Sequence, residues 1–222
     1  MKVLEVQFRG WTATPRMPFI LSGNAICMAT PSYSLLLGLV GCCLGRPVEP
    51  NEVRLGFRYD FDGTAYDVET RHRLVFKDKK FKEHPKGTDA YTREFHINPR
   101  LTLWLDRTDW EEFFLCPIGA PGLGRSQDLL KITAVRQMEA QPISIATLRG
   151  CMLPFKAGQL MIPGQLVQLA EAFRENETVG TGRTSTQSRI FIAIPPDNET
   201  SVETSNLFQT PDSQPFYLHE WS

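Results

Sequence analysis

The chain has 222 residues and a formal net charge of −1 at pH 7; 41% of its residues are hydrophobic and 22% are charged. This is the composition of an ordinary globular protein, long enough to bury a core without a metal or disulfide staple. The near-neutral balance excludes a protein that is basic over its whole surface. The longest apolar run, residues 35–44, is far shorter than the ~20 residues needed to cross a bilayer.

The five cysteines show no C-x-x-C spacing, and their number is odd. The first residues, MKVLEVQF, mix polar with apolar side chains, unlike the apolar region of a signal peptide. We therefore expect a reduced, cytoplasmic protein with no zinc site, no other cofactor and no membrane contact.

The chain opens with a predicted strand and helix. Apolar residues mostly alternate over residues 3–8, which predicts a strand ending at Arg9-Gly10. The apolar run 35–44 predicts a helix, with a hydroxyl available near Ser32 to cap its start and Gly45 to end it.

A long basic hairpin is predicted next. Residues 51–61 alternate like a strand, and Asp62-Gly63 is typical of a tight hairpin turn leading into a return strand at 66–76. Residues 77–87 are charged and turn-like, and strand character resumes over 92–105. We expect these segments to protrude from the body of the protein.

The second half is less regular. A short helix is predicted from Thr108 to Cys116-Pro117, then a glycine-rich loop at 119–126 and a strand at 129–136. The remaining predictions are a helix at 166–174, polar loops at 176–188 and 197–214, a strand at 189–194 and an edge segment at 216–221.

The order strand, helix, strand, hairpin, helix, glycine loop, strand predicts an α+β fold. It is that of a ferredoxin-like (RRM-type) βαββαβ core with insertions.

Charge is unevenly distributed along the chain. Residues 71–100 hold nine basic and four acidic residues, which leaves +5 in thirty residues and about −6 elsewhere. Basic residues interleaved with Phe76, Phe81, Tyr91 and Phe95 can follow phosphates and wedge between nucleotides. The alternative is a solvated charged face.

Two further segments favour nucleic acid. In FRGWTATPR, Arg9, Trp11 and Arg16 can stack on unpaired bases; the alternative is a half-buried tryptophan between solvated arginines. In the loop GLGRS, glycines let the backbone approach a phosphate on which Arg125 and Ser126 can close, although a bare turn explains it nearly as well. The loop lacks the Walker pattern, which disfavours nucleotide hydrolysis.

Catalytic patterns are sparse, because the four histidines are scattered and no hydrolase or metalloprotease motif occurs. A metal-independent RNA-cleaving site could combine Tyr33 or Tyr91 with His84 and Lys86. Surface imidazoles are the simpler interpretation.

The segments FRGWTATPR, PSYSLLLGLVGCCLG, REFHINPRLTLWL and PIGAPGLGRSQDL, in this order, resemble the fifth family of CRISPR-associated proteins. This family belongs to the RAMP superfamily and to the type I surveillance complex, Cascade. The likeness runs from Met1 to about Ile132. It implies a ferredoxin-like domain at 1–142 with a β-hairpin thumb at about 66–105, and a variable β-rich region at 143–222 packed on it.

The resemblance also implies a role. The protein would hold the 5′ handle of the crRNA and cap the backbone filament, between the backbone subunit and the large subunit, and would meet target DNA only through the complex. The RNA-binding residues that it and the basic hairpin together suggest are Arg9, Trp11, Arg16, Ser32, Tyr33, Arg71, Arg73, Lys77, Lys79, Lys80, Lys82, Arg93, Gly124, Arg125 and Ser126.

In one subtype the relative itself cleaves the repeat RNA, whereas in most others a separate protein does so. Since no convincing Tyr-His-Lys site is present, we expect a non-catalytic subunit with no catalytic residue. The alternative is a metal-independent endoribonuclease that cleaves the CRISPR repeat.

Overall fold

The computed structural model describes residues 1–18, 23–155, 162–175 and 182–221. A four-stranded antiparallel sheet forms the centre of the molecule, in the order β4-β7-β1-β8. Its strands are β1 (Lys2–Gly10), β4 (Leu55–Asp60), β7 (Arg100–Leu105) and β8 (Leu130–Glu139). The helical elements are α1 (Tyr33–Leu44), η1 (Pro50–Glu52), η2 (Thr108–Trp110) and α2 (Glu111–Leu115).

The two faces of this sheet have different partners. Leu4, Val6 and Phe8 of β1 point into the main core formed with α1 and α2, while Val3 and Glu5 point to the opposite side, hereafter the open face. This alternation is the period-2 pattern expected of a strand, and the predicted strand at 3–8 is confirmed.

Helix α1 begins and ends where the sequence predicts. The Ser32 hydroxyl accepts a hydrogen bond from the Leu35 N–H at 3.2 Å, and Gly45 adopts a left-handed conformation with φ of 69°. These two caps satisfy backbone groups that the helix itself leaves unpaired.

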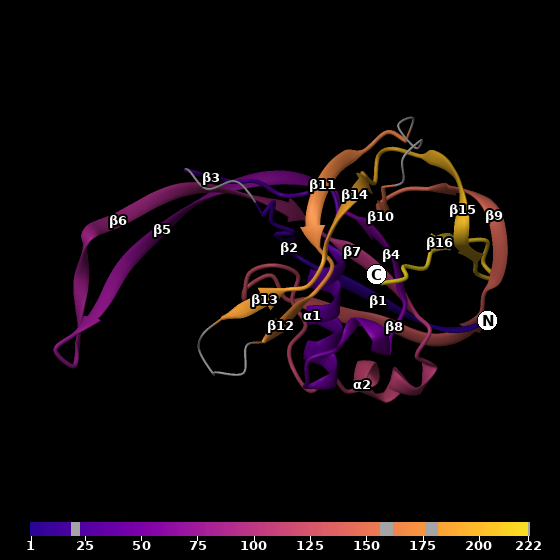
Figure 1. The fold of residues 1–222 in the computed structure, drawn as a ribbon, viewed down its shortest axis with the longest axis horizontal. Coiled ribbons are helices and arrows are strands. Elements are labelled where there is room, and N and C mark those ends of the chain that lie inside the picture. The colour runs from indigo at the N-terminus through magenta and orange to yellow at the C-terminus, as the bar shows by residue number, and fades with distance from the viewer. Residues whose placement is uncertain (19–22, 156–161, 176–181, 222) are drawn as a thin grey trace.

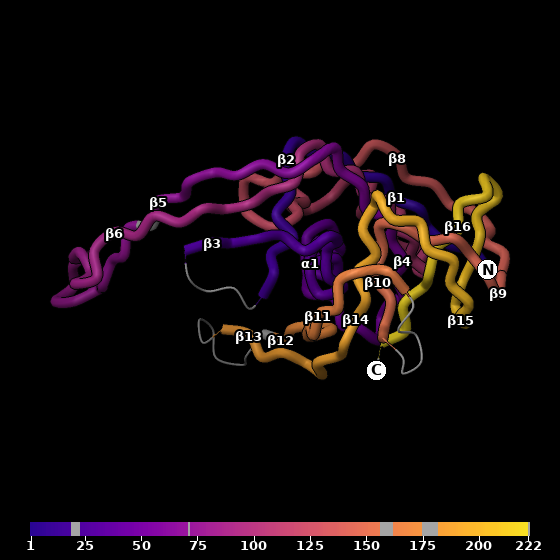
Figure 2. The backbone as a smooth tube through the Cα atoms, turned by 90° about the horizontal axis from the view of Figure 1, so that it is seen from above, coloured from indigo at the N-terminus to yellow at the C-terminus, as the bar shows by residue number. Residues whose placement is uncertain are grey.

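The thumb is the hairpin of β5 (Gly63–Lys77) and β6 (Lys80–Ile97), which projects from the body as a long arm (Figures 1 and 2). Its turn lies at Asp78 and Lys79, with φ of 56° and 60°. Positive φ at both central residues is what a two-residue type I′ turn requires.

This arrangement corrects three predictions. Asp62-Gly63 does not join a hairpin, because β4 pairs with β7 and β5 pairs with β6. Residues 80–87 are not a loop but part of β6, and residues 100–105 belong to the central sheet rather than to the thumb. At the root, β2 (Thr12–Ala13) and β3 (Asn24–Ala25) pair with β6.

The rest of the chain forms two small sheets and a ribbon, in the orders β16-β15-β9, β10-β14-β11 and β12-β13. Their strands are β9 (Gln141–Leu148), β10 (Cys151–Pro154), β11 (Gln165–Ala170), β12 (Phe173–Glu175), β13 (Arg183–Ser185), β14 (Ser188–Ile194), β15 (Thr200–Gln209) and β16 (Pro215–Tyr217).

The predicted strand at 189–194 is confirmed as β14. The predicted helix at 166–174 is wrong, because Val167 and Leu169 are buried while Leu166 and Gln168 are exposed, the alternation of strand β11. The stretch 197–214 was predicted to be a polar loop, yet it contains β15. Of the predicted loop at 176–188, residues 176–181 lie outside the described part.

The C-terminal strands cover one end of the open face. The Trp104 and Phe216 rings stack with centroids 4.6 Å apart, in a cluster that includes Val3 and Leu218. The last residues also extend the β4 edge, since the His219 N–H donates to the Leu55 carbonyl at 2.9 Å. Within the described residues, no helix has the length and apolar character to cross a membrane.

Candidate nucleic-acid interface

The far end of the thumb combines unpaired cations with exposed aromatic rings. Lys77 and Lys80 lie directly opposite each other beside the turn, and neither forms an ion pair with any described residue. The next pair, Phe76 and Phe81, is 64% and 73% exposed, with ring centroids 5.2 Å apart. Like charges directly opposite in a hairpin are destabilising, so this tip is not arranged for the stability of the free protein.

Other charges of the thumb are matched within it. Lys82 forms an ion pair with Asp78 at 2.6 Å across the turn. Arg73 bonds to Asp89, which joins β5 to β6 halfway along the hairpin. Both cations remain at least one-third exposed and can still face a phosphate.

Arg93 does not reach the surface of the thumb. Its side chain is buried, is bonded to Glu69 and to the Tyr91 hydroxyl, and lies over the Tyr91 ring at 5.1 Å. It holds the two strands together near the root. The side chain of Arg71 lies outside the described part.

Trp11 stands free at the root of the thumb. Its side chain is 85% exposed, while its carbonyl accepts the Asn98 N–H at 2.9 Å in the turn that joins β6 to β7. Arg16 is also exposed. It forms an isolated β-bridge with Cys27, whose N–H donates to Glu94 of β6. An exposed, firmly anchored indole is a suitable platform for an unpaired base.

A row of cations crosses the open face beside Trp11. By strand register, Arg9 of β1 lies opposite Arg100 of β7 on one side and Lys131 of β8 on the other. Arg100 is bonded to Asp60 and Asp62, whereas Arg9 and Lys131 form no ion pair with any described residue. Sequence reasoning included Arg9 but missed Lys131, because the register that joins them is set by strand pairing.

The glycine loop is stapled to the root of the thumb. The buried Asp128 carboxylate accepts hydrogen bonds from Thr12 at 2.6 Å, from Thr14, and from the backbone and guanidinium of Arg125. Burial by itself raises the pKa of Asp128, but these hydrogen bonds outweigh it and the pKa is lowered.

Gly124 is needed for this close approach. Its φ is 120°, and a Cβ there would lie 2.5 Å from the Thr14 carbonyl oxygen. Arg125 is held between Asp128 and the Phe95 ring, with its guanidinium 5.6 Å from the ring centroid, and is mostly buried. Ser126 remains exposed, so the loop offers a hydroxyl and backbone to a ligand rather than a free guanidinium.

Ser32 and Tyr33 lie elsewhere. Ser32 caps helix α1, and the buried Tyr33 donates its hydroxyl to the Met152 carbonyl at 2.6 Å and stacks on His219 at 3.9 Å. Tyr33 thereby positions C-terminal residues against the core, and both side chains are buried, so neither offers a surface to RNA.

Neither tyrosine considered for RNA cleavage lies beside His84 and Lys86. Tyr33 lies in the core, and His84 is on β6, seven residues and therefore roughly 23 Å of extended chain from Tyr91. His96 is buried against Phe61, 3.8 Å between ring centroids, and burial lowers its pKa to about 4.

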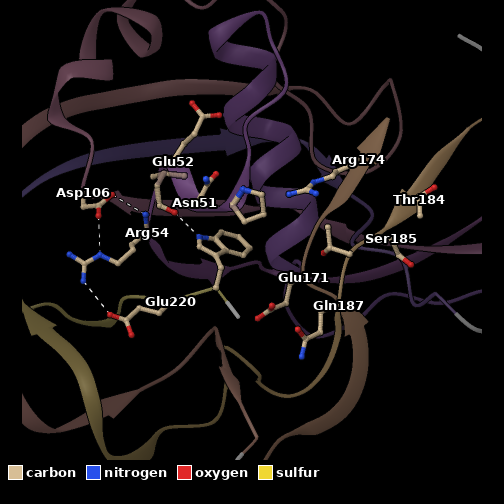
Figure 3. A pocket seen from close by; sticks show the side chains of 14 residues that line it. Asn51, Glu52, Arg54, Asp106, Glu171, Arg174, Thr184, Ser185, Gln187 and Glu220 are labelled. Carbon is tan, nitrogen blue, oxygen red and sulfur yellow. Dashed lines mark hydrogen bonds and ion pairs between the residues drawn. The ribbon is translucent and has the colours of Figure 1, made fainter. Parts of the chain in front are cut away.

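Figure 3 shows a hollow of about 950 Å³. Its lining residues Val53, Arg54 and Asp106 lie beside the start of β4 and the end of β7, at the opposite end of the central sheet from the thumb. Acidic side chains outnumber basic ones in its lining, and Arg54 is bonded to Asp106 and Glu220. This charge balance does not suit an anionic ligand. No group of three or more metal-binding side chains occurs among the described residues.

No protein-family model matches the chain, and no curated protein matches it in sequence. Solved structures share its fold. A chain of a CRISPR RNA-guided surveillance complex matches with a TM-score of 0.53 and 16% identity over 91% of both chains. A CRISPR protein from Archaeoglobus fulgidus matches with a TM-score of 0.50 and 9% identity over 100% of both.

A chain of the type III-B Cmr-beta complex bound to cognate target RNA matches with a TM-score of 0.53 and 9% identity over 99% of both chains. At these identities the likeness establishes a common fold and nothing about the ligands of this chain.

Proposed function

We propose that the protein is a non-catalytic RNA-binding subunit of a type I CRISPR surveillance complex, which holds the 5′ handle of the crRNA and caps the backbone filament. The observation that carries this proposal is the thumb, a long hairpin whose tip joins unpaired lysines to exposed phenylalanines. Basic grooves with aromatic platforms are the common means of binding single-stranded RNA.

The fold supports the same assignment. Read in chain order, β1, α1, β4, β7, α2 and β8 follow the sequence βαββαβ, and the sheet order β4-β7-β1-β8 is the one we assign to a ferredoxin-like core. The solved structures of the same fold are described as parts of CRISPR complexes or as a CRISPR protein.

The proposed RNA-contacting residues are those left accessible by the fold. They are Arg9, Trp11, Arg16, Arg73, Lys77, Lys79, Lys80, Lys82, Gly124 and Ser126. Arg93 and Arg125 support this surface from behind through Glu69 and Asp128. In the complex the partners would be the backbone and large subunits of Cascade, and target DNA would be met only through them.

The alternative, a metal-independent endoribonuclease, has less support. Its candidate Tyr33 is buried. His96, another histidine of the thumb, has a pKa of about 4, so its imidazole is neutral and enclosed at pH 7. His84 and Lys86 lie together on β6 without Tyr33.

One experiment tests both readings. Purified protein is mixed with labelled CRISPR repeat RNA in EDTA at several salt concentrations, and the same samples are analysed for binding and for cleavage. We expect binding without cleavage, with log affinity falling by about 0.7 per phosphate contact against log salt. Cleavage at one position would replace the proposal with the endoribonuclease, and no binding at low salt would refute both.

A further inference from the structure

The open face of the central sheet carries a groove that runs from the cation row towards the C-terminal strands. The C-terminal strands cover the end of this face at Val3 and Trp104, and the uncovered part forms a hollow of about 330 Å³. This is at the small end of the roughly 300–1,000 Å³ usual for ligand sites. Its lining includes four arginines, Arg9, Arg58, Arg100 and Arg136, and three acidic residues, Glu5, Asp60 and Asp212.

Arg58, in the inner part of the groove, contacts a neutral group. The Arg58 guanidinium donates to the Gln214 side-chain oxygen at 2.7 Å and has no carboxylate bonded to it among the described residues. Burial, followed by the neighbouring Arg149, lowers the pKa of Arg58, and the carboxylates of Asp60 and Glu199 offset this only in part. Arg58 is thus a partly buried cation close to a second one, which an anion would stabilise.

A turn of the C-terminal region occupies the inner end. Asp212 in this turn forms an ion pair with Arg136 at 2.8 Å, and Arg136 also bonds to the buried Glu5 at 2.8 Å. The turn is closed by the Ser213 N–H, which donates to the Thr210 carbonyl at 3.0 Å. A carboxylate and an amide oxygen therefore stand where an anionic ligand would meet Arg136 and Arg58.

We infer that this groove is a second RNA site, which takes a phosphodiester of single-stranded RNA between Arg58 and the row formed by Arg9 and Lys131, in competition with Asp212. The inference rests on the proposed RNA-binding function and adds a place where the strand continues from the thumb. A bound phosphate would offset the repulsion between Arg9 and Lys131, which have no ion pair with any described residue, and would stabilise the partly buried charge of Arg58.

RNA fits this groove better than an acidic protein segment because of its neighbours. Arg9 is two residues from the exposed Trp11, and the Arg100 side chain donates to the Asn98 carbonyl in the turn at the foot of the thumb. A strand leaving the groove meets an aromatic platform and then the basic hairpin, a sequence of contacts suited to alternating phosphates and bases.

The test measures fluorescence anisotropy of a short labelled oligouridylate with the full chain in EDTA. The groove variant combines Arg58→Gln with Lys131→Gln, neither of which leaves a described carboxylate unpaired. We expect it to weaken binding roughly tenfold at low salt, with a shallower salt dependence. Asp212→Asn is expected to tighten binding by about threefold, because it removes the competing charge.

Matched controls are Lys2→Gln and Glu203→Gln, exposed residues of β1 and β15 outside the groove lining, which are expected to bind like the unmodified chain. A Lys79→Gln, Lys80→Gln variant tests the thumb separately. If this thumb variant loses affinity and the groove variant does not, the groove inference fails while the proposed function stands. If no variant changes binding, the groove inference and the proposed function both fail. If an oligoglutamate at equal concentration displaces the RNA from the groove, the groove binds an acidic protein segment rather than RNA.

Discussion

The tip of the thumb and the glycine loop at its root both present cations, yet they treat charge in opposite ways. At the tip Lys77 faces Lys80 with no acidic partner among the described residues, and Phe76 and Phe81 are left in solvent. At the root the Asp128 carboxylate accepts hydrogen bonds from Thr12, Thr14 and Arg125, and Arg125 packs against Phe95. Under the proposed function, residues of similar chemistry serve ligand binding where their charge is unmatched and stabilise the scaffold where it is matched.

The sharpest test of the root is Asp128→Ala. It leaves the Thr12, Thr14 and Arg125 donors without their acceptor in a buried place, and we expect a loss of about 3 kcal/mol in the free energy of unfolding. Urea denaturation measures this, with Asp197→Ala on the surface as control. A loss no larger than that of the control would mean that Asp128 is not a structural centre.

Acidification tests how completely His96, at the root of the thumb, is shielded from water. His96 has a folded-state pKa of about 4 against an ordinary 6.5, because burial disfavours its charged form. The unfolded chain therefore binds the extra proton first, so stability is full above pH 6.5 and falls as the pH drops towards 4, by about 2–3 kcal/mol. Unfolding free energies at several pH values check this. His96→Gln should flatten the dependence, while His72→Gln on the exposed part of β5 should leave it intact.

Trp11→Ala tests the exposed aromatic platform at the root of the thumb. The side chain is exposed, so we expect stability to change little while RNA binding weakens by roughly 1–3 kcal/mol, the worth of one base stack. Anisotropy titrations and thermal unfolding of the same preparations separate the effects. Trp11→Phe should retain much of the affinity, and equal binding by both variants would argue against stacking.

The smallest effect is expected at the tip. Replacing Lys77, Lys79 and Lys80 with Gln should reduce RNA affinity by about 1 kcal/mol and flatten its salt dependence, with folding stability unchanged or slightly raised because a like-charge pair is removed. The measurements are binding at low and moderate salt and urea unfolding. A substantial loss of stability would show that the tip is part of the scaffold, like the glycine loop.

Strand pairing explains which predictions failed. Asp62-Gly63 has the composition of a hairpin turn, but β4 finds its partner in β7 across forty residues of chain. The Leu166 segment has apolar residues that suit either a helix or a strand, and its pairing with β14 decides for a strand. Local patterns cannot choose between partners that lie at different distances along the chain.

The candidate site divides in the same way. The excess of basic residues and the interleaved aromatics along 71–100 were visible in the sequence. The structure leaves Phe76 and Phe81 exposed at the tip, whereas ion pairs engage Arg73, Lys82, Arg93 and Arg100. Tyr33 and Arg125 were suggested by the family resemblance and Arg93 by the basic hairpin, yet packing directs each of them inward, to Met152, Asp128 and Glu69 respectively. Residue type alone does not distinguish a ligand-facing arginine from one that is already paired.

By itself the sequence determined the periodicity of β1, the caps of α1 and the charge asymmetry, because these depend on neighbours within a few residues. Tertiary structure alone decided which strands pair, which cations lie beside an acidic partner and which part of the open face stays uncovered. These features depend on strand register. If β1 shifted by one residue, Arg9 would lie on the other face of the sheet and no longer beside Arg100 and Lys131.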